Sequence, residues 1–330
     1  MSLEQKNKPW RPNAEIAELK HRADLLRKIR DFFSEREVFE VETPLMCRTA
    51  SLDPFIQPIP ALYSSLAAEA GRMFYLQSSP EFAMKRLLAA GSGPIYQICK
   101  AFRNAEEGRL HNPEFTMLEW YRPGFDHHAL MDEMEALLAV VLGSSKTDRF
   151  TYQALFLEYL GVDPLQTSLQ QLSLCAAEQG VHLEAQVQAE LSLDDWLDLL
   201  MTHCIEPKLG FDQPVMIYDY PASKAALAKI RPTEPPVAER FEVYVNGIEL
   251  ANGFHELMDP AIQLARFNKD CEFRKQLGYP AIPIDDYFLA ALEFGLPASA
   301  GVALGIDRLV MLALGKSEIQ AVVSFTIDRV

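Results

Sequence analysis

Three charged residues occupy positions where a charge is energetically unfavourable unless a group of opposite charge binds beside it. Arg103 ends a run of strand-forming residues and borders a charged loop. Arg308 lies at a predicted helix start, where a cation is electrostatically disfavoured, so it suits a bound anion. Glu249 lies on an apolar strand, where a buried carboxylate needs a partner or a metal ion. Two guanidinium groups and an acid-held cation are what a nucleoside triphosphate needs.

The segment 102–121 is predicted to form two strands around a loop. Gly108 and Asn112-Pro113 favour a turn, and the second arm is rich in β-forming residues. Because strand side chains alternate, one face would carry an aromatic ring, a carboxylate and a tyrosine. These residues are Phe115, Met117, Glu119 and Tyr121. Such a face suits a nucleotide and a second ligand, although an amphipathic hairpin with a solvated loop is the alternative.

Polar oxygens gather after a second predicted hairpin, 241–253, whose Asn246-Gly247 pair is a strong two-residue turn signal. Its return arm carries Glu249 and Asn252, and Glu256 follows. A single buried glutamate is usually a satisfied structural ion, but three polar groups favour a site. Oxygen ligands suit Mg²⁺, which bridges protein carboxylates and nucleotide phosphates.

Two further polar groups of residues allow competing interpretations. Ser79-Pro80-Glu81 has ordinary helix-start features, yet a carboxylate fixed there could pair with a substrate ammonium group. Asp126-His127-His128, with Asp132 and Glu133, could hold a metal ion. Adjacent histidines point different ways and no ligand spacing recurs, so capping of the helix 129–142 is favoured instead.

These residues need a framework of helices and strands. Apolar periodicity predicts a helix over 14–36, with Asn13 as its cap, and further helices over 82–90, 260–277 and 285–294. Strands are predicted over 38–44, 73–79, 95–102 and 215–220, and the run 301–311 passes from strand to helix, where Asp307 could cap.

Composition places the chain among globular proteins. It has 330 residues, 49% of them hydrophobic and 23% charged, with a net charge of −15 that argues against a nucleic-acid surface. Five scattered cysteines fit a reducing cytosol, so a cytoplasmic location is expected. No apolar run approaches the ~18 residues of a membrane span.

The hairpin around Arg103, above all the run His111-Asn112-Pro113-Glu114-Phe115-Thr116-Met117, resembles motif 2 of the class II aminoacyl-tRNA synthetases in its lysine-type form. The helix, strand and proline ending at Pro44 resemble motif 1, and 301–311 resembles motif 3. The resemblance implies an α+β class II catalytic fold, an antiparallel β-sheet flanked by helices. It also implies one domain over 1–330, with a helical insertion at roughly 143–212.

Three positions depart from the family pattern. Ala105 stands where motif 2 usually has glutamate, a role that Glu106 could take over. Glu37 stands where motif 1 often has glycine. Ala303 replaces the middle glycine of motif 3, and its methyl group would reshape the amino-acid pocket. One methyl group contributes only ~1 to 3 kcal/mol to the discrimination between two amino acids.

The resemblance assigns roles to individual residues. Arg103, Arg308 and Glu249 are implied to be catalytic, with Glu249 and Asn252 on Mg²⁺. The amino acid is implied to contact Ser79, Pro80, Glu81, Tyr121, Glu256 and Ala303. ATP is implied to contact Arg103, Asn104, Ala105, Glu106, Asn112, Phe115, Glu249, Leu250, Gly305 and Arg308.

Only a dozen polar residues precede the first helix, so the anticodon-binding barrel of lysyl-tRNA synthetases is expected to be absent. The chain therefore resembles truncated paralogues that activate β-lysine and ligate it to a lysine of translation elongation factor P. The expected partners are that factor, β-lysine or lysine, and a second copy of the chain, but neither a membrane nor tRNA. A tRNA-charging lysyl-tRNA synthetase and an inactive synthetase-like regulator are the alternatives.

Overall fold

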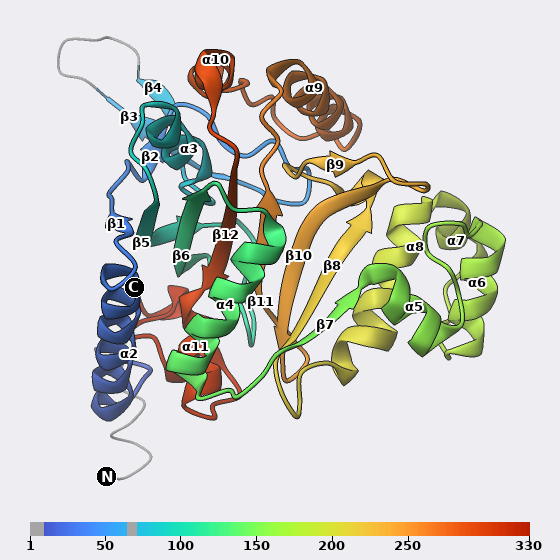
Figure 1. Ribbon diagram of the computed structural model, residues 1–330, viewed down its shortest axis with the longest axis horizontal. Coiled ribbons are helices and arrows are strands. Elements are labelled where there is room, and N and C mark those ends of the chain that lie inside the picture. Colours follow the sequence, from blue (N-terminus) through green and yellow to red (C-terminus); the bar gives the residue numbers. More distant parts are fainter. Residues whose placement is uncertain (1–9, 65–70) are drawn as a thin grey trace. The chain divides into compact units, whose positions relative to one another are not determined.

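The computed structural model describes residues 10–64 and 71–330. The chain divides into two compact units (Figure 1). The first contains the described residues up to Gly124, with Met258–Ala298 and Ala303–Val330; the second contains Phe125–Leu257 and Ser299–Val302. Strand β12 (Ser299–Gly305) is divided between them. Mostly antiparallel strands with flanking helices make up both units, which confirms the predicted α+β class.

The predicted hairpin forms the centre of the first unit. Strands β5 (Ile95–Phe102) and β6 (Glu114–Pro123) pair antiparallel, with Phe102 opposite Glu114 and Ile95 opposite Tyr121. Strand β1 (Phe39–Glu40) pairs parallel with β5. Three shorter strands form a separate sheet in the order β2 (Met46–Cys47), β4 (Arg72–Leu76) and β3 (Ile59–Tyr63).

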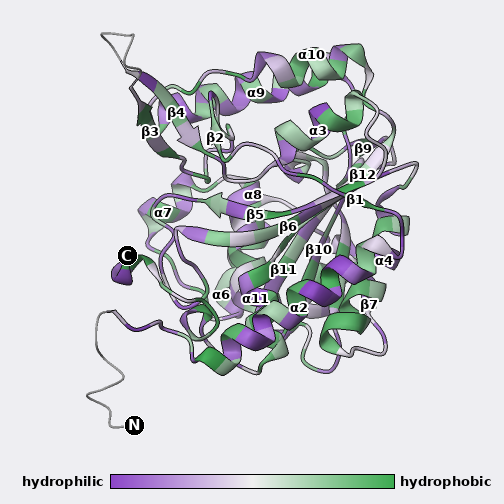
Figure 2. Cartoon of the chain, turned by 90° about the vertical axis from the view of Figure 1, so that its left-hand side faces the viewer, coloured by the Kyte–Doolittle hydropathy of each residue, from purple (hydrophilic) through white to green (hydrophobic). Residues whose placement is uncertain are grey.

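Helix α2 (Ile16–Ser34) packs on this hairpin through one apolar face. Hydrophilic and hydrophobic residues interleave along it (Figure 2), and Leu25, Ile29, Phe32 and Phe33 are its buried residues. The Phe33 ring stacks on Tyr96 of β5, with 4.4 Å between ring centroids. Burial of these side chains fixes the helix against the strands that carry candidate site residues.

The described part of the first unit also contains the α-helices α3 (Glu81–Ala89), α9 (Pro260–Gln276), α10 (Asp286–Gly295) and α11 (Ile306–Ala313). Phe82 of α3 stacks on Phe288 of α10, with 4.7 Å between ring centroids. The Thr116 N–H of β6 donates to Asp307 Oδ2 over 2.8 Å, and Arg22 pairs with Oδ1 over 2.7 Å. Asp307 therefore ties α11 to β6 and α2. The prediction that Asp307 caps its own helix is wrong, because Gly305 holds the N-cap position.

The second unit contains four strands in the order β11 (Ile248–His255), β10 (Val237–Val245), β8 (Val215–Pro221) and β7 (Asp148–Thr151), while β9 (Ile230–Arg231) pairs with the start of β10. Asn246 and Gly247 join β10 to β11 with φ of 51° and 71°, as a tight hairpin requires. Helix α4 (His127–Leu142) packs on β10 and β11. Asp126 caps α4 by accepting from the Ala129 N–H, as predicted.

Helices α5 (Tyr152–Leu160), α6 (Leu169–Glu178), α7 (Ala185–Glu190) and α8 (Leu193–Leu200) lie within the range predicted to be a helical insertion. They share a buried cluster that includes Tyr152, Phe156 and Trp196. Ser168 and Ser192 begin α6 and α8 with capping boxes, which satisfy two orphan N–H groups each. Strand β7 also falls inside this range and pairs parallel with β8.

Two local predictions are wrong. Asn13 does not cap α2, whose N-cap is Glu15 without a side-chain bond; Asn13 Oδ1 instead accepts from the Thr326 N–H. The strand predicted over 38–44 is only two residues long. Its pairing ends after the Val41 N–H bonds to the Tyr96 carbonyl, and Pro44 has no N–H with which to extend it.

None of the described helices is both long and apolar enough to cross a membrane. All five cysteines are free thiols, as the scattered spacing predicted.

Candidate active site

Glu119 is the centre of a buried polar cluster on β6. The Ser79 hydroxyl donates to Glu119 Oε2 and the Tyr121 hydroxyl to Oε1, each over 2.6 Å. The Ser79 oxygen also accepts from the Glu81 N–H at the start of α3, over 3.0 Å. The structure thus brings together three residues predicted to hold the amino acid, Ser79, Glu81 and Tyr121, around one carboxylate.

The protonation of Glu119 is shifted by this environment. Burial raises its pKa, and the nearby charge of Glu81 raises it further, to about 7, against the opposing hydrogen bonds from Ser79 and Tyr121. A cation near both carboxylates would favour their charged forms. The pair is therefore suited to a ligand that brings an ammonium group.

Lys85 already supplies one such cation inside the chain. Its Nζ donates to Glu81 Oε1 over 2.6 Å, one turn along α3, and its side chain is buried. The Lys85 ammonium group also lies 5.8 Å from the centre of the Phe288 ring. Glu81 can therefore bind a substrate ammonium group only to the extent that Lys85 leaves its carboxylate unoccupied. The sequence spacing gave no sign of the pairing between Lys85 and Glu81.

The predicted phosphate-binding arginine lies against the predicted adenine platform. The Arg103 guanidinium carbon is 5.2 Å from the centre of the Phe115 ring, and Nη1 is 3.8 Å from Glu106 Oε1. Nε of Arg103 is buried and has no acceptor among the described residues. An unfilled buried donor beside an aromatic face suits the phosphate of a nucleotide.

The loop after Arg103 has an unusual backbone at Ala105. Its φ of 62° lies in the left-handed region that non-glycine residues seldom adopt. The Ala105 N–H donates to Asn104 Oδ1, and the Asn104 N–H donates to the Gln57 carbonyl. Because Glu106 then reaches Arg103, it occupies a position from which it could replace the glutamate missing at Ala105. Glu37, another of the three departures from the family pattern, also has a positive φ, of 54°.

Arg308 is held by a residue to which the sequence assigned no role. Its Nη2 lies 2.7 Å from His111 Nε2, and its Nε donates to the Leu110 carbonyl over 3.4 Å. Burial lowers the pKa of His111, and the charge of Arg308 lowers it further, so the neutral ring accepts from the guanidinium group. The charge of Glu106 raises the pKa of His111, and the charge of Arg103 lowers it. Arg103 and Arg308 therefore both lie near this imidazole.

Asn112 is buried, but its side chain is occupied by the backbone. Its Nδ2 donates to the Glu114 carbonyl over 2.7 Å, and its Oδ1 accepts from the Ile327 N–H over 3.0 Å. Arg109 of the same loop donates to the Ser317 carbonyl and accepts from the Ile319 N–H. The C-terminal tail, defined here as residues 317–330, thus fastens the loop between β5 and β6.

The candidate metal ligands lie in the second unit. Glu249 and Asn252 are on β11, opposite Tyr244 and Glu242 of β10 respectively. Glu242 is buried and accepts from the hydroxyl groups of Tyr220 and Tyr244 over 2.7 and 2.6 Å. The cluster therefore offers two carboxylates and one amide oxygen.

Arg240 balances this acidic cluster. Its Nε donates to Asn252 Oδ1 over 3.2 Å, and its Nη2 bonds to Glu242. Burial lowers the pKa of Arg240, but the charges of Glu242 and Glu249 outweigh burial and raise it overall. Sequence reasoning missed Arg240 and Glu242, although charged residues alternating with apolar ones over 240–243 were a usable signal.

The remaining predicted residues have these positions. Glu256 is buried directly after β11, and its N–H donates to the Ser299 carbonyl over 3.0 Å. Leu250 is buried on β11, while Ala303 and Gly305 lie on β12 and are partly exposed. Arg103 and Arg308 belong to the first unit and Glu249 to the second, so their meeting at one triphosphate stays a prediction.

The donor set in the second unit fits the implied magnesium ion. Glu249, Asn252 and Glu242 present only oxygen atoms, which Mg²⁺ prefers over nitrogen or sulfur.

Known proteins resemble this chain along nearly its full length. Residues 4–329 match the model of the class II tRNA synthetases (D, K and N). A Vibrio cholerae protein named elongation factor P–(R)-β-lysine ligase is 55% identical over 98% of this chain and 99% of its own length. Proteins of the same name from Vibrio atlanticus and Edwardsiella ictaluri are 52% and 49% identical, each over 97% of this chain and 98% of their own length.

Proposed function

This chain belongs to the family of class II tRNA synthetases (D, K and N), and from that premise we propose that it activates (R)-β-lysine with ATP and ligates it to a lysine of translation elongation factor P. The observation that carries this proposal is the match to ligases of that name, from end to end in both chains, at 49–55% identity. The chain is thus an ATP-dependent ligase.

In the first step, the carboxylate of the amino acid attacks the α-phosphorus of ATP, so that an aminoacyl-adenylate forms and pyrophosphate leaves. Such chemistry depends on positioning and charge neutralisation more than on a protein nucleophile. Arg103 holds the α-phosphate, which its unfilled buried Nε supports, and Phe115 offers a face to adenine. Arg308 holds the γ-phosphate, oriented by the neutral His111.

Glu249 and Asn252, with Glu242 beside them, hold Mg²⁺ in this proposal. When bound, the ion neutralises charge on the leaving pyrophosphate. Arg240 keeps Asn252 Oδ1 and Glu242 oriented by donating to both. Leu250, Gly305, Asn104, Ala105, Glu106 and Asn112 complete the nucleotide site, with Asn112 shaping the loop rather than binding directly.

The amino acid has two ammonium groups, and in this proposal each of them pairs with one glutamate. Glu81 takes one and Glu256 the other, while Ser79, Pro80 and Tyr121 shape the pocket around Glu119. The methyl group of Ala303 tunes the preference between α- and β-lysine. In the second step, the amine of the acceptor lysine attacks the activated carbonyl and AMP leaves.

We also propose a cytoplasmic homodimer with one catalytic domain over 1–330, a helical insertion at roughly 143–212 and no tRNA partner. Exposed apolar side chains on α2 and β1, including Ile16 and Phe39, support dimer formation through the motif 1 elements. The five free thiols support a reducing compartment.

Charging of tRNA is the second candidate, because the matching family model covers tRNA synthetases. ATP–pyrophosphate exchange with (R)-β-lysine and with α-lysine, followed by mass measurement of elongation factor P, separates the two. We expect faster exchange with β-lysine and a mass gain of one β-lysyl group on the factor. Charged tRNA with an unmodified factor would favour the second candidate, and no exchange with either amino acid would favour an inactive regulator.

Arg308→Ala tests the role given to the second arginine. Loss of a preorganised positive charge at a transition state lowers turnover by about 10² to 10³. We expect a loss of that size in ATP–pyrophosphate exchange, with an unchanged circular dichroism spectrum. Arg27→Ala is the matched control, because Arg27 is largely exposed on α2 and, among the described residues, pairs with the neighbouring exposed Asp24. Equal exchange by Arg308→Ala and the wild type would contradict the assignment.

A further inference from the structure

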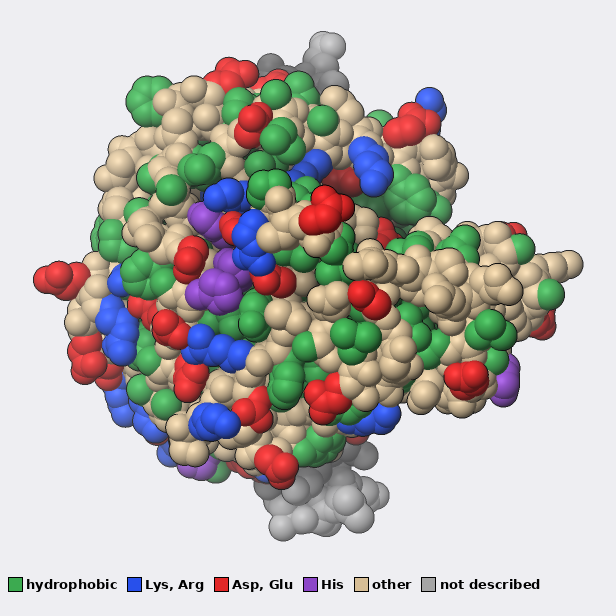
Figure 3. Space-filling view, turned by 45° about the vertical axis from the view of Figure 1, so that its right-hand side comes forward, with side chains coloured by type: hydrophobic (Ala, Val, Ile, Leu, Met, Phe, Trp, Pro, Cys, Tyr) green, Lys and Arg blue, Asp and Glu red, His purple; other side chains and the backbone are tan. Residues whose placement is uncertain are grey.

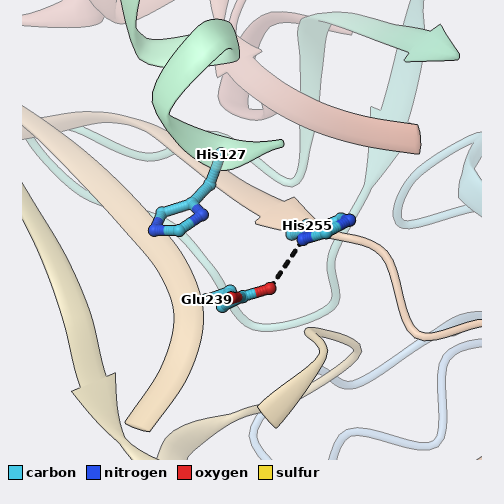
Figure 4. Close-up of side chains that lie close together, drawn as sticks. All are labelled: His127, Glu239 and His255. Atoms are coloured by element: carbon cyan, nitrogen blue, oxygen red, sulfur yellow. Dashed lines mark hydrogen bonds and ion pairs between the residues drawn. The ribbon is translucent and has the colours of Figure 1, made fainter. Parts of the chain in front are cut away.

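His127, Glu239 and His255 form a second cluster of potential metal ligands, away from the oxygen-only set at Glu249. Each offers one ligand atom, and these atoms all lie within 4.8 Å of one another. Figure 4 shows the three side chains together: His127 comes from the start of α4, Glu239 from β10 and His255 from the end of β11. Within the residues that the structure describes, it is the one such group of three.

This triad lies on the opposite face of the β10–β11 hairpin from Glu242 and Asn252. Alternation places Glu239 with Phe241 and Val243, whose side chains are buried, and places Arg240 with Glu242 on the other face. The triad is therefore a separate site that shares its strands with the candidate active site.

His127 is the observation that points to a ligand. Its side chain is 2% exposed, and neither ring nitrogen makes a hydrogen bond of good geometry to any described residue. Nε2 lies 3.3 Å from Asp219 Oδ1, an ion-pair distance, and the ring faces the Glu239–His255 pair (Figure 4). A buried ring nitrogen without a partner among the described residues, as Nδ1 is, is costly, whereas a carboxylate behind the other nitrogen is how proteins orient a metal-binding histidine.

Glu239 and His255 are already in contact. His255 Nδ1 lies 2.6 Å from Glu239 Oε2. Tetrahedral zinc with bonds of about 2.0–2.1 Å needs ligand atoms about 3.4 Å apart, a spacing that lies between this contact and the 4.8 Å limit. Small movements of side chains would therefore suffice to surround one ion.

Two cations compete with a metal for Glu239. Arg231 Nη1 lies 3.5 Å from Oε1, while Lys229 Nζ lies 3.9 Å from Oε2 and is substantially exposed. Arg231 also bonds to Asp219. Because Arg231 engages the other oxygen and Lys229 is only loosely placed, Oε2 remains accessible to an ion once the lysine swings into solvent. In Figure 3, histidine side chains likewise lie together among basic and acidic side chains.

We propose that His127, His255 and Glu239 bind one divalent transition-metal ion of the zinc class, with Asp219 orienting His127 from behind. Two imidazoles and a carboxylate suit zinc and its neighbours rather than magnesium. The ion would tie the start of α4 to the start of β10 and the end of β11. This inference does not depend on the proposed function, because it concerns binding alone.

The test is calorimetric titration of ZnCl₂ into the full-length protein after removal of metals with EDTA and of any histidine tag. We expect one Zn²⁺ per chain and a raised unfolding temperature. Glu239→Gln and His255→Gln should each weaken binding by more than 100-fold, and Asp219→Asn by about 10- to 100-fold. His128→Gln is the matched control, because His128 neighbours His127 but is outside the triad, and it should bind as the wild type does.

Co²⁺ distinguishes the triad from the five free thiols, which also bind zinc. A Co²⁺ complex of the triad should show visible bands of a tetrahedral nitrogen–oxygen site without the charge-transfer band of a thiolate ligand. Circular dichroism identifies any variant that fails to fold. The zinc affinities of the variants that do fold then test the proposal. The proposal is overturned if the folded wild type takes up no Zn²⁺, or if Glu239→Gln and His255→Gln bind as tightly as it does.

Discussion

At the scale of a single residue, Glu119 links the stability of the folded chain to pH. Its pKa is about 7 in the folded chain, because burial and the Glu81 charge disfavour the carboxylate. In an unfolded chain it would have an ordinary value near 4.5. The folded state therefore holds the proton more tightly, and the stability that this contributes is full below about pH 4.5 and is lost as the pH rises through 7.

We predict that Glu119→Gln removes this dependence. Thermal unfolding of the ligand-free protein between pH 5.5 and 8 should show the wild type losing stability as the pH rises, while the variant changes less over the same range. Tyr121→Phe is a useful companion, because it removes the 2.6 Å hydroxyl donor but leaves the carboxyl group. Parallel pH profiles for the wild type and Glu119→Gln would show that Glu119 does not titrate in this window.

At the scale of the element, β11 depends on the absence of a side chain at Gly253. A Cβ atom there would lie 2.5 and 2.6 Å from the Phe241 ring and 2.9 Å from Val302. Glycine thus lets β11 lie close to Phe241 and Val302.

Gly253→Ala should therefore destabilise the protein by about 1–3 kcal/mol, the usual cost of forcing extra atoms into a packed core. Urea unfolding followed by circular dichroism would measure the change. Gly108→Ala is the control, because no described atom lies within 4 Å of its added Cβ, and it should leave the midpoint nearly unchanged. Equal midpoints for both variants would mean that Phe241 moves aside at little cost.

The sequence was most informative about elements whose signal is local. Strand β5 has the predicted bounds, since alternation and the following turn define both ends, and the Asn246-Gly247 hairpin formed because both residues tolerate a positive φ. Side-chain pairs between distant segments leave no such pattern. His111 with Arg308, separated by 197 positions, was missed for this reason.

The group of possible metal ligands around His127 shows the same limit of prediction from sequence. Around His127 no ligand spacing recurs in the sequence, so capping of a helix is predicted there instead. The structure instead brings Glu239 and His255 to it from a hairpin more than a hundred positions away. The residues implied by family resemblance are still predictions, although Ser79, Glu81 and Tyr121 do surround one carboxylate.

At the scale of the whole molecule, we predict a dimer formed through α2 and β1. Phe39 is 63% exposed, and apolar side chains of this size on a surface often mark a contact with another chain. Light scattering should give twice the 37.2 kDa mass of one chain. Phe39→Arg should shift the mass toward the monomer, whereas Phe294→Arg, at an 82% exposed site on α10, should not. A monomeric wild type would contradict this use of motif 1.

The fastening of the 103–113 loop by the last residues of the chain has a practical consequence. Ile327 and Ile319 donate to Asn112 and Arg109, so the backbone near the carboxyl terminus sets the shape of a loop two hundred positions upstream. An affinity tag or fusion partner appended after Val330 would pull on that fastening. Apparent weakness toward ATP in such a preparation would then reflect how the protein was purified rather than its native chemistry.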